Sequence, residues 1–275
     1  YNKGNALGIL GKLPEAIECF DKALVINPRD DQVWYNKGLA LGNLGKLPEA
    51  IECYDKSLEI NPRLFMAWDN KGLELDKLGK SQQAIECFDK ALVINPRYAE
   101  AWLNKGTSLA TLGNILEAIE CYDKALEIDS KNVRVWYHKG VALQCIGKLT
   151  EAIECYDRGL EIDPRNASIW CNKGLALANL GIRQESIKCF DKALEIDPRI
   201  PETWLNKGIA LKTLGNYLGA IQCYDKAIEI NRRDSKIWSH KGFVLHTIGK
   251  LPEAIGCYDK SLEIDSGDAG TWSNR

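Results

Sequence analysis

The sequence predicts an all-α solenoid, in which antiparallel helical hairpins of equal length stack one after another. Two observations lead to this fold class. All eight tryptophans of the 275-residue chain are spaced by 34 residues, and apolar residues recur at helical spacing within each period. A fixed period of this length is typical of repeat architectures built from one supersecondary unit. The tryptophans are Trp34, Trp68, Trp102, Trp136, Trp170, Trp204, Trp238 and Trp272.

The first half of each period is expected to form one helix. In the unit at residues 31–64, Trp34, Gly38 and Leu41 fall on one helical face. The small Gly38 would let a neighbouring helix approach closely, and Gly45 suits the left-handed residue that follows a helix C-terminus. The same glycine recurs as Gly11, Gly79, Gly113, Gly147, Gly181, Gly215 and Gly249.

The second half of each period is expected to form a helix that runs back along the first. It opens near Pro48, which is tolerated in a first turn because its missing N–H is not needed there. Asn61-Pro62 ends it, since the residue before a proline is pushed out of helical geometry. Its buried stripe is predicted to be Ala50, Ile51, Tyr54, Ser57, Leu58 and Ile60.

Contacts in such an array are between neighbours, so we expect a single array over residues 1–275 rather than several domains. Neither end shows a polar capping helix, which favours a piece of a longer repeat region. The predicted repeats are 1–30, 31–64, 65–98, 99–132, 133–166, 167–200, 201–234 and 235–268, with the start of a ninth at 269–275.

These units resemble the tetratricopeptide repeat (TPR) family over the whole chain. The resemblance rests on the Trp-x3-Gly start, the mid-repeat glycine, the Ala-x3-Tyr/Phe pair and the closing Asn/Asp-Pro. It implies a right-handed superhelix whose first helices line a concave binding groove. The chain departs from the pattern locally, at Ser130, Arg232 and Ser266 for the closing proline, Ser186 for the small alanine, and Gly159 inside a helix.

A lysine precedes each first-helix glycine, where the family commonly has an apolar residue. We expect its stem to lie along apolar surface with the charged head in solvent. A row of ion pairs with second-helix acids is the alternative. These residues are Lys3, Lys37, Lys71, Lys105, Lys139, Lys173, Lys207 and Lys241.

The composition argues against several classes of function. The chain has 36 basic and 38 acidic residues, so no basic footprint indicates nucleic acid. No apolar run approaches membrane-spanning length, and no signal peptide is visible. Eight of the ten cysteines recur with the repeat and are expected to be buried packing residues in a reducing compartment. We therefore expect a cytoplasmic protein with no nucleic-acid or membrane partner.

No motif indicates chemistry. The sequence lacks a nucleophile–base pair, a phosphate-binding loop and a zinc-type cysteine pair. His138 and Cys145 share a helix face but lie about 10.5 Å apart along the axis, which is too far for one ion. We expect no catalytic residue, no metal and no cofactor, and hence no enzymatic activity in this segment.

The candidate binding residues follow each tryptophan. An asparagine lies two positions after it, with histidines at 138 and 240, and is similar to the groove asparagine ladder of superhelical TPR proteins. Such amides can bind the backbone of an extended peptide. In the alternative, they hydrogen-bond only within their own repeat. The predicted ladder is Asn36, Asn70, Asn104, Asn172 and Asn206.

An apolar column accompanies the ladder and is expected to contact ligand side chains. Its principal members are Leu39, Leu73, Tyr137 and Ile209, and it also includes Tyr35, Leu103, Val141, Leu175, Leu205 and Phe243.

Charged residues of the groove predict a polarity for the ligand. Asp69, Asp76 and Glu100 make repeats three and four acidic, whereas Arg134, Lys212 and Lys236 make later repeats more basic. We expect a ligand that is basic over the former and acidic over the latter. No basic cluster suited to a chaperone-tail carboxylate is present.

These observations favour a non-catalytic scaffold that binds an extended peptide or partner segment. Two alternatives remain. The array could be the substrate-recognition arm of a larger enzyme, or it could self-associate end to end through uncapped terminal repeats.

Overall fold

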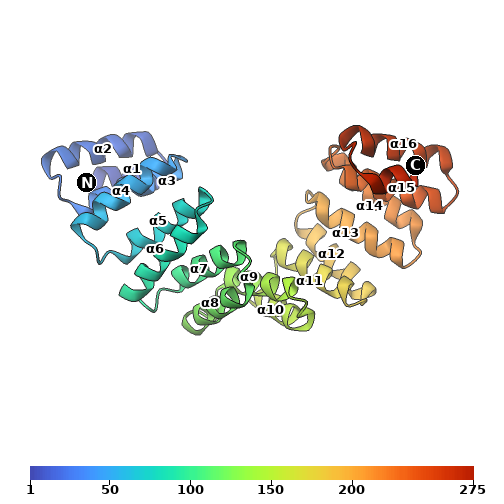
Figure 1. The fold of residues 1–275 in the computed structure, drawn as a ribbon, viewed down its shortest axis with the longest axis horizontal. Coiled ribbons are helices and arrows are strands. Elements are labelled where there is room, and N and C mark those ends of the chain that lie inside the picture. The colour runs from blue at the N-terminus through green and yellow to red at the C-terminus, as the bar shows by residue number, and fades with distance from the viewer. The chain divides into compact units, whose positions relative to one another are not determined.

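The computed structural model describes residues 1–275, apart from the side chain of Ala269, and its regular elements are all helices (Figure 1). The all-α prediction is confirmed. The helices belong to two compact units, Tyr1–Ala142 and Leu143–Arg275. That all the hairpins act as one array stays a prediction.

Each period forms a first helix and a second helix that pack as an antiparallel hairpin. Full-length first helices have 13 residues and second helices have 14. The first unit contains α1 (Asn2–Ile9), α2 (Leu13–Ile26), α3 (Asp31–Asn43), α4 (Leu47–Ile60), α5 (Phe65–Lys77), α6 (Ser81–Ile94), α7 (Ala99–Thr111) and α8 (Ile115–Ile128), and α9 (Val133–Cys145) begins in it. The second unit contains α10 (Leu149–Ile162), α11 (Ala167–Asn179), α12 (Arg183–Ile196), α13 (Pro201–Thr213), α14 (Tyr217–Ile230), α15 (Ser235–Thr247), α16 (Leu251–Ile264) and α17 (Ala269–Asn274).

The turn between the two helices of a hairpin is made by the glycine that the sequence singles out. Gly45 has a φ of +77°, and the other seven glycines at this position lie between +73° and +85°. Side chains with a Cβ rarely adopt this conformation. The prediction of a left-handed residue after each first helix is therefore confirmed.

The tryptophan of each repeat is hydrogen-bonded to the turn that precedes its helix. Trp34 Nε1 donates a hydrogen bond of 2.9 Å to the backbone oxygen of Pro28, six residues earlier. Because the acceptor is a main-chain carbonyl, Ser130, Arg232 and Ser266 serve equally well where the closing proline is missing. The departures from the family pattern leave this bond intact.

The core of a hairpin forms where the second-helix aromatic meets the first-helix glycine. Tyr54 and Ala50 are fully buried, and so is Ser57, which donates to the backbone oxygen of Asp31. A Cβ added to Gly38 would lie 2.6 Å from Tyr54 Cε1. The predicted close approach is thus confirmed, and burial of an aromatic of this size contributes about 2 kcal/mol.

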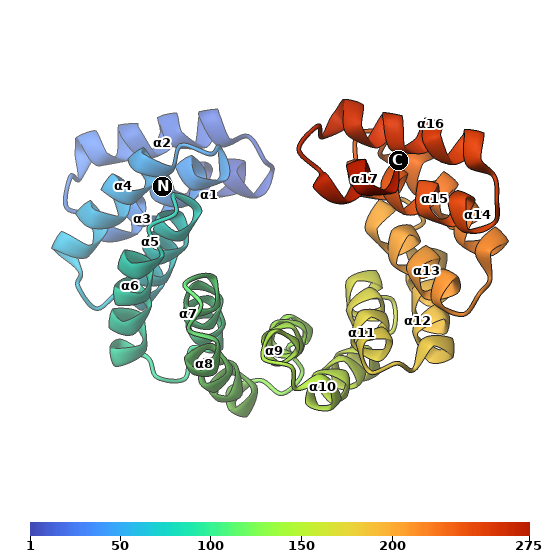
Figure 2. The same ribbon diagram turned by 45° about the vertical axis from the view of Figure 1, so that its right-hand side comes forward.

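Neighbouring hairpins stack so that first helices also touch each other. In the first unit α3 contacts α5 and α5 contacts α7, and in the second unit α11 contacts α13 and α13 contacts α15. Figure 2 shows the paired helices α5 with α6 and α7 with α8. We call the surface formed by residues one, two and five positions after each tryptophan site the first-helix face. In α3 these residues are Tyr35, Asn36 and Leu39.

Candidate functional site

A groove of about 360 Å³ lies among α1, α2 and α3 in the first unit. Its apolar lining includes Phe20 and Leu39, and the polar residues Asn36 and Asn43 also line it. The structure thus brings together two predicted ligand-binding residues, Asn36 and Leu39. The full lining is Asn5, Gly8, Ile9, Leu13, Phe20, Asn36, Leu39, Ala40 and Asn43.

The ladder asparagines of the first unit bond from one hairpin to the preceding hairpin. Asn36 Nδ2 donates to Tyr1 OH at 3.0 Å, and Asn70 Nδ2 donates to Tyr35 OH at 3.1 Å. Each acceptor precedes its asparagine by 35 residues and lies one position after a tryptophan site. Neither alternative for the ladder anticipated these bonds between hairpins.

The two ladder asparagines of the second unit form bonds of different kinds. Asn172 Nδ2 donates to the backbone oxygen of Ser168, one turn earlier in its own helix, at 2.9 Å. Asn206 hydrogen-bonds the Cys171 thiol, whose pKa is raised by burial and lowered in part by this bond and by that from Thr203. Asn172 is therefore held within its own helix, whereas Asn206 bonds to the residue 35 positions earlier, as Asn36 and Asn70 do.

Histidine replaces asparagine where the preceding hairpin offers a leucine instead of an acceptor. His138 stacks on Tyr122 with ring centroids 6.1 Å apart, and His240 stacks on Tyr224 in the same way. Burial lowers the pKa of both imidazoles. Leu103, the leucine that precedes His138, is fully buried, so its predicted place in an exposed apolar column is wrong.

Asp69 is a buried carboxylate rather than an exposed groove charge. It is 3% exposed and accepts hydrogen bonds from Asn104 Nδ2 at 3.0 Å and Tyr98 OH at 3.3 Å. Burial raises the pKa of Asp69 to about 6, although these two bonds oppose the shift. Since Asn104 is itself 7% exposed, the expectation that Asp69 and Asn104 present accessible polar groups is wrong.

Glu74 is a further buried carboxylate, and the sequence reasoning missed it. It is 5% exposed, pairs with Lys77 at 2.9 Å, and packs where Gly42 leaves room. Equivalent positions in the neighbouring repeats hold Ala40 and Ser108. Comparing repeats column by column, rather than reading each helix alone, would have singled it out.

The other predicted acidic residue of α5, Asp76, is half-buried. Its Oδ1 accepts a 2.6 Å hydrogen bond from the Ser81 hydroxyl. Glu100 of α7 pairs with Arg134 at 3.3 Å. The acidic residues of repeats three and four are therefore held by local partners.

The principal apolar residues are half-buried. Leu39, Leu73 and Ile209 pack against the cores of their own units. Tyr137 lies edge-on to His138 with ring centroids 5.2 Å apart. In contrast, Phe243 is 45% exposed and lies under Lys212, whose Nζ is 5.1 Å from the ring centroid. The column is thus accessible only in part.

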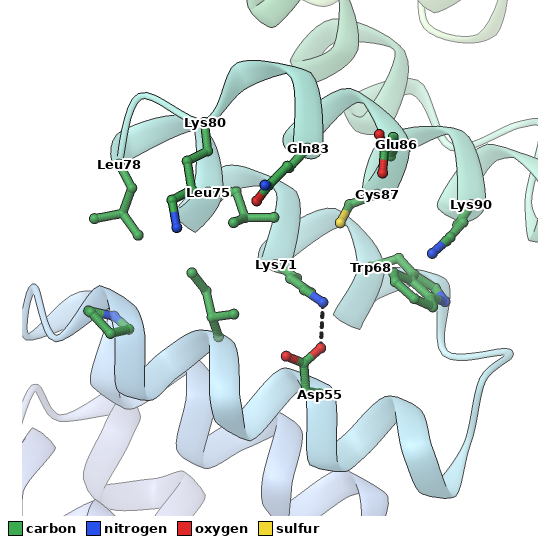
Figure 3. Close-up of a pocket in the computed structure, with 12 residues that line it drawn as sticks. Asp55, Trp68, Lys71, Leu75, Leu78, Lys80, Gln83, Glu86, Cys87 and Lys90 are labelled. Carbon is green, nitrogen blue, oxygen red and sulfur yellow. Dashed lines mark hydrogen bonds and ion pairs between the residues drawn. The ribbon is translucent and has the colours of Figure 1, made fainter.

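From Lys37 onward the repeated lysine forms ion pairs, as the alternative interpretation held, and the solvated head was the wrong expectation there, whereas Lys3 is exposed. Lys71 Nζ lies 2.5 Å from Oδ1 of Asp55 and 5.6 Å from the centroid of the Trp68 ring (Figure 3). The aspartate belongs to the second helix of the preceding hairpin, 16 residues earlier. The equivalent pairs are Lys37–Asp21, Lys105–Asp89, Lys139–Asp123, Lys173–Asp157, Lys207–Asp191 and Lys241–Asp225, and Arg275–Asp259 follows the same spacing.

A second type of groove, of about 450 Å³, lies among α4, α5 and α6 beside this ion pair (Figure 3). Ile51, Leu75 and Trp68 contribute to its lining, and Lys90 Nζ lies 4.3 Å from the centroid of the Trp68 ring. A groove around Trp170 occupies the same repeat position in the second unit. This type of groove is therefore a product of hairpin stacking.

Among the described residues, no group of three histidine, cysteine or acidic side chains could hold a metal ion, and none of the helices could cross a membrane. Burial raises the pKa of the Cys53, Cys121 and Cys189 thiols to about 11. Thiols with such pKa values are poor nucleophiles near neutral pH.

Protein-family models match most of the chain. A model described as tetratricopeptide repeat matches residues 32–64, 66–98, 99–132, 167–200 and 201–234, together more than half of the sequence. A TPR repeat model matches 4–45 and 146–181, and a further tetratricopeptide repeat model matches 121–154. No curated protein matches the chain.

Several solved structures share the fold. The APC/C hetero-tetramer Cut9–Hcn1 matches with a TM-score of 0.69 and 19% identity, over 99% of this chain and 54% of the matched chain. This chain therefore spans about half the length of that relative. PilF of Pseudomonas aeruginosa matches with a TM-score of 0.67 and 22% identity, over 76% of this chain and 95% of its own.

One further match, YrrB, is described as a TPR protein with an unusual peptide-binding site. Its TM-score is 0.58 and its identity is 24%, over 72% of this chain and 98% of its own. At these identities the three likenesses concern the fold alone.

Proposed function

The chain belongs to the tetratricopeptide repeat family, and from this premise we propose that it is a non-catalytic scaffold that binds an extended segment of a partner protein along the first-helix face. The groove among α1, α2 and α3 carries the proposal, because amides lie beside an apolar lining there. An extended peptide can match both, because its backbone carries N–H and C=O groups and its side chains can be apolar.

The chemistry of the amides supports a backbone ligand. An asparagine side chain has an acceptor oxygen and two donor hydrogens, which match the N–H and C=O of a peptide group. Asn36 and Asn70 are half-buried rather than fully buried, so a ligand lying on the face can reach them. Asn104 contributes indirectly, because it holds Asp69.

The apolar residues of the face would contact ligand side chains. Leu39 lines the groove, and Leu73 occupies the equivalent position one hairpin later. A half-buried leucine retains some exposed surface that binding would remove from water, at about 25 cal/mol for each Å². YrrB, which shares the fold, is described as having a peptide-binding site, and this agrees with a peptide ligand here.

For the second unit we propose contact with acidic ligand side chains. Lys212 lies over the exposed Phe243 ring. We also propose that Ile209 of this unit and Tyr137 of the first unit contact apolar side chains of the ligand. A cation held against an aromatic ring can still pair with a carboxylate of a ligand. We propose the cytoplasm as the compartment, since buried thiols such as those of Cys53 and Cys121 are typical of a reducing environment.

The experiment is a pull-down from a random peptide library with the full chain. Wild type is compared with a double variant, Asn36→Ala with Asn70→Ala, after circular dichroism has verified equal helicity. The matched control is Asn114→Ala, an exposed asparagine before α8 whose side chain makes no cap hydrogen bond.

We expect wild type and Asn114→Ala to recover the same peptides and the double variant to bind them at least tenfold more weakly. Equal recovery by all three proteins would contradict a ligand-binding role for the face.

A further inference from the structure

We infer that the first-helix face of the first unit presents hydrogen-bond acceptors, and therefore selects a partner segment rich in donors, namely one that carries lysine or arginine. This inference rests on the proposed function, because it concerns the ligand of the same face. Its basis is the direction in which the ladder amides are held.

The donors of Asn70 are already occupied within the chain. Its Nδ2 donates to Tyr35 OH at 3.1 Å and to the backbone oxygen of Met66 at 2.8 Å. An amide nitrogen carries only two hydrogens, so both are in use. The carbonyl oxygen Oδ1 is then the group that Asn70 can offer to a ligand.

The orientation of these amides is fixed by their partners. If Asn70 were turned over, its Oδ1 would face the carbonyl oxygen of Met66, and two acceptors would meet without a hydrogen. Turning Asn104 would place its Oδ1 against the Asp69 carboxylate, which now accepts from Nδ2. Either turn would exchange a hydrogen bond for two acceptors facing each other, so each amide stays as it is.

The residue one position after the tryptophan site therefore determines which group the ladder asparagine of the next hairpin can offer to a ligand. A tyrosine or an aspartate at that site draws the Nδ2 of the following asparagine toward itself, as Tyr35 and Asp69 do. Tyr1 does the same for Asn36. The pattern is thus common to three successive hairpins of the unit.

The charged residues around these ladder asparagines favour the same ligand. Asp69 lies beside Asn70 in the sequence and accepts from Tyr98 and Asn104, and Asp76 accepts from a serine hydroxyl; among the described residues neither carboxylate forms an ion pair. The nearby Lys71 and Lys105 are turned toward second-helix aspartates by their ion pairs. The field along α5 is therefore negative, which attracts cations.

A lysine or arginine side chain suits both conditions. Its charged head has only donors and no acceptor, and its positive charge complements the acidic surroundings. An acidic segment would instead set carboxylates against amide oxygens and against Asp76. Hydrogen bonding and charge thus favour one class of partner.

The first experiment uses three synthetic 12-residue peptides in which serine alternates with lysine, glutamate or asparagine. Fluorescence anisotropy measures their binding to the full chain in moderate salt. We expect the lysine probe to bind at least tenfold more tightly than the glutamate probe. We also expect a lysine probe with methylated backbone nitrogens to bind several-fold more weakly, since it keeps the lysine ammonium groups but lacks the backbone N–H groups, from which Asn70 Oδ1 would also accept hydrogen bonds.

Two matched variants separate the face from general attraction to an acidic protein. Asp69→Asn with Asp76→Asn removes two carboxylates from α5, the buried Asp69 and the half-buried Asp76, and should lower the lysine preference at least threefold. The control, Glu117→Gln with Glu127→Gln, removes two charges from exposed positions on α8 and should leave the preference unchanged. An equal loss in both variants would overturn the inference.

A third variant tests the direction of the amide. Tyr35→Phe removes one acceptor of Asn70 and frees one Nδ2 hydrogen for a ligand carbonyl. We expect the asparagine probe to gain affinity relative to the lysine probe, and an unchanged ratio would contradict the fixed orientation.

The outcomes separate this inference from the proposed function. If no probe binds and the library yields no peptide, the proposed function fails and the inference fails with it. If binding depends on Asn70 but the glutamate or asparagine probe binds as tightly as the lysine probe, the proposed function stands and the inference is wrong.

Discussion

Lys71 Nζ lies 2.5 Å from Oδ1 of Asp55, and this ion pair joins α5 to the second helix of the preceding hairpin. The lysine side chain is 19% exposed and the aspartate side chain is 45% exposed, so solvent screens the pair in part. The energy of one such pair is small. Its recurrence at successive junctions indicates that it helps to fix how hairpins align.

A double-mutant cycle on this pair measures its contribution. We expect Lys71→Met and Asp55→Asn to show a coupling free energy of about 0.5–1 kcal/mol in urea unfolding followed by circular dichroism. About 1 M NaCl should remove most of it, because the screening length falls to about 3 Å. Lys56 and Glu59, a pair within α4, provide the control and should couple more weakly. A coupling that persists in high salt would contradict this view of the pair.

Gly38 is predicted to tolerate no side chain. A Cβ there would lie 2.6 Å from the buried ring of Tyr54, so Gly38→Ala should destabilise the protein by about 1–3 kcal/mol. Gly256→Ala is the control, because its added Cβ would meet nothing within 4 Å in α16. That change should stabilise by about 0.5–1 kcal/mol. Thermal unfolding should therefore move in opposite directions for the two variants, and shifts of the same sign would refute the argument.

The burial of Asp69 should make stability depend on pH. Its pKa in the folded protein is about 6, above the usual 3.8, so the folded state holds this proton more tightly than the unfolded state. The resulting stabilisation is present below about pH 4 and is lost as the pH rises through about 6. The difference corresponds to about 3 kcal/mol.

Asp69→Asn isolates this effect from other titrating groups. Asparagine keeps an acceptor for Asn104 but carries no charge, so we expect the variant to be more stable than wild type at pH 7. The advantage should shrink as the pH falls to 4, as measured by urea unfolding at each pH. A variant that is less stable at pH 7 would show that the carboxylate stabilises the fold.

The tryptophan hydrogen bond should be indifferent to the residue that supplies its acceptor. Trp34 donates to the backbone of Pro28 and Trp136 donates to the backbone of Ser130, both at 2.9 Å. Replacing either tryptophan by phenylalanine removes this bond, at about 1 kcal/mol, together with part of the buried ring. We expect the two losses in unfolding free energy to agree within about 0.5 kcal/mol. A much larger loss at Trp34 would assign the closing proline a role of its own.

The hairpin fold was predictable because its determinants are local. Gly45 and Pro48 act within a few residues of the chain, and the spacing of Trp34 and Gly38 needs only the helical period. The buried Tyr54 also follows from that period. Each of these features depends on residues within one repeat, and one repeat can be recognised directly in the sequence.

The candidate site was predicted only in part because its contacts join different hairpins. Asn36 and Leu39 do line one groove, as expected from one helix face. The burial of Asp69 depends on Tyr98 and Asn104 of the next hairpin, and the partner of Lys71 lies in the preceding one. Sequence reasoning that treats a helix by itself assigns such charges to solvent.

The tryptophan indole bonds to a main-chain carbonyl, and this has a consequence for how such a gene can change. An acceptor that every amino acid possesses places no demand on the sequence of the adjoining unit. Tandem duplication or unequal recombination in multiples of 34 codons would therefore leave the tryptophan hydrogen bond intact at each new boundary between repeats. The number of repeats is then free to vary under selection. Single-residue insertions are not tolerated in the same way, because they break the spacing of six residues between indole and carbonyl.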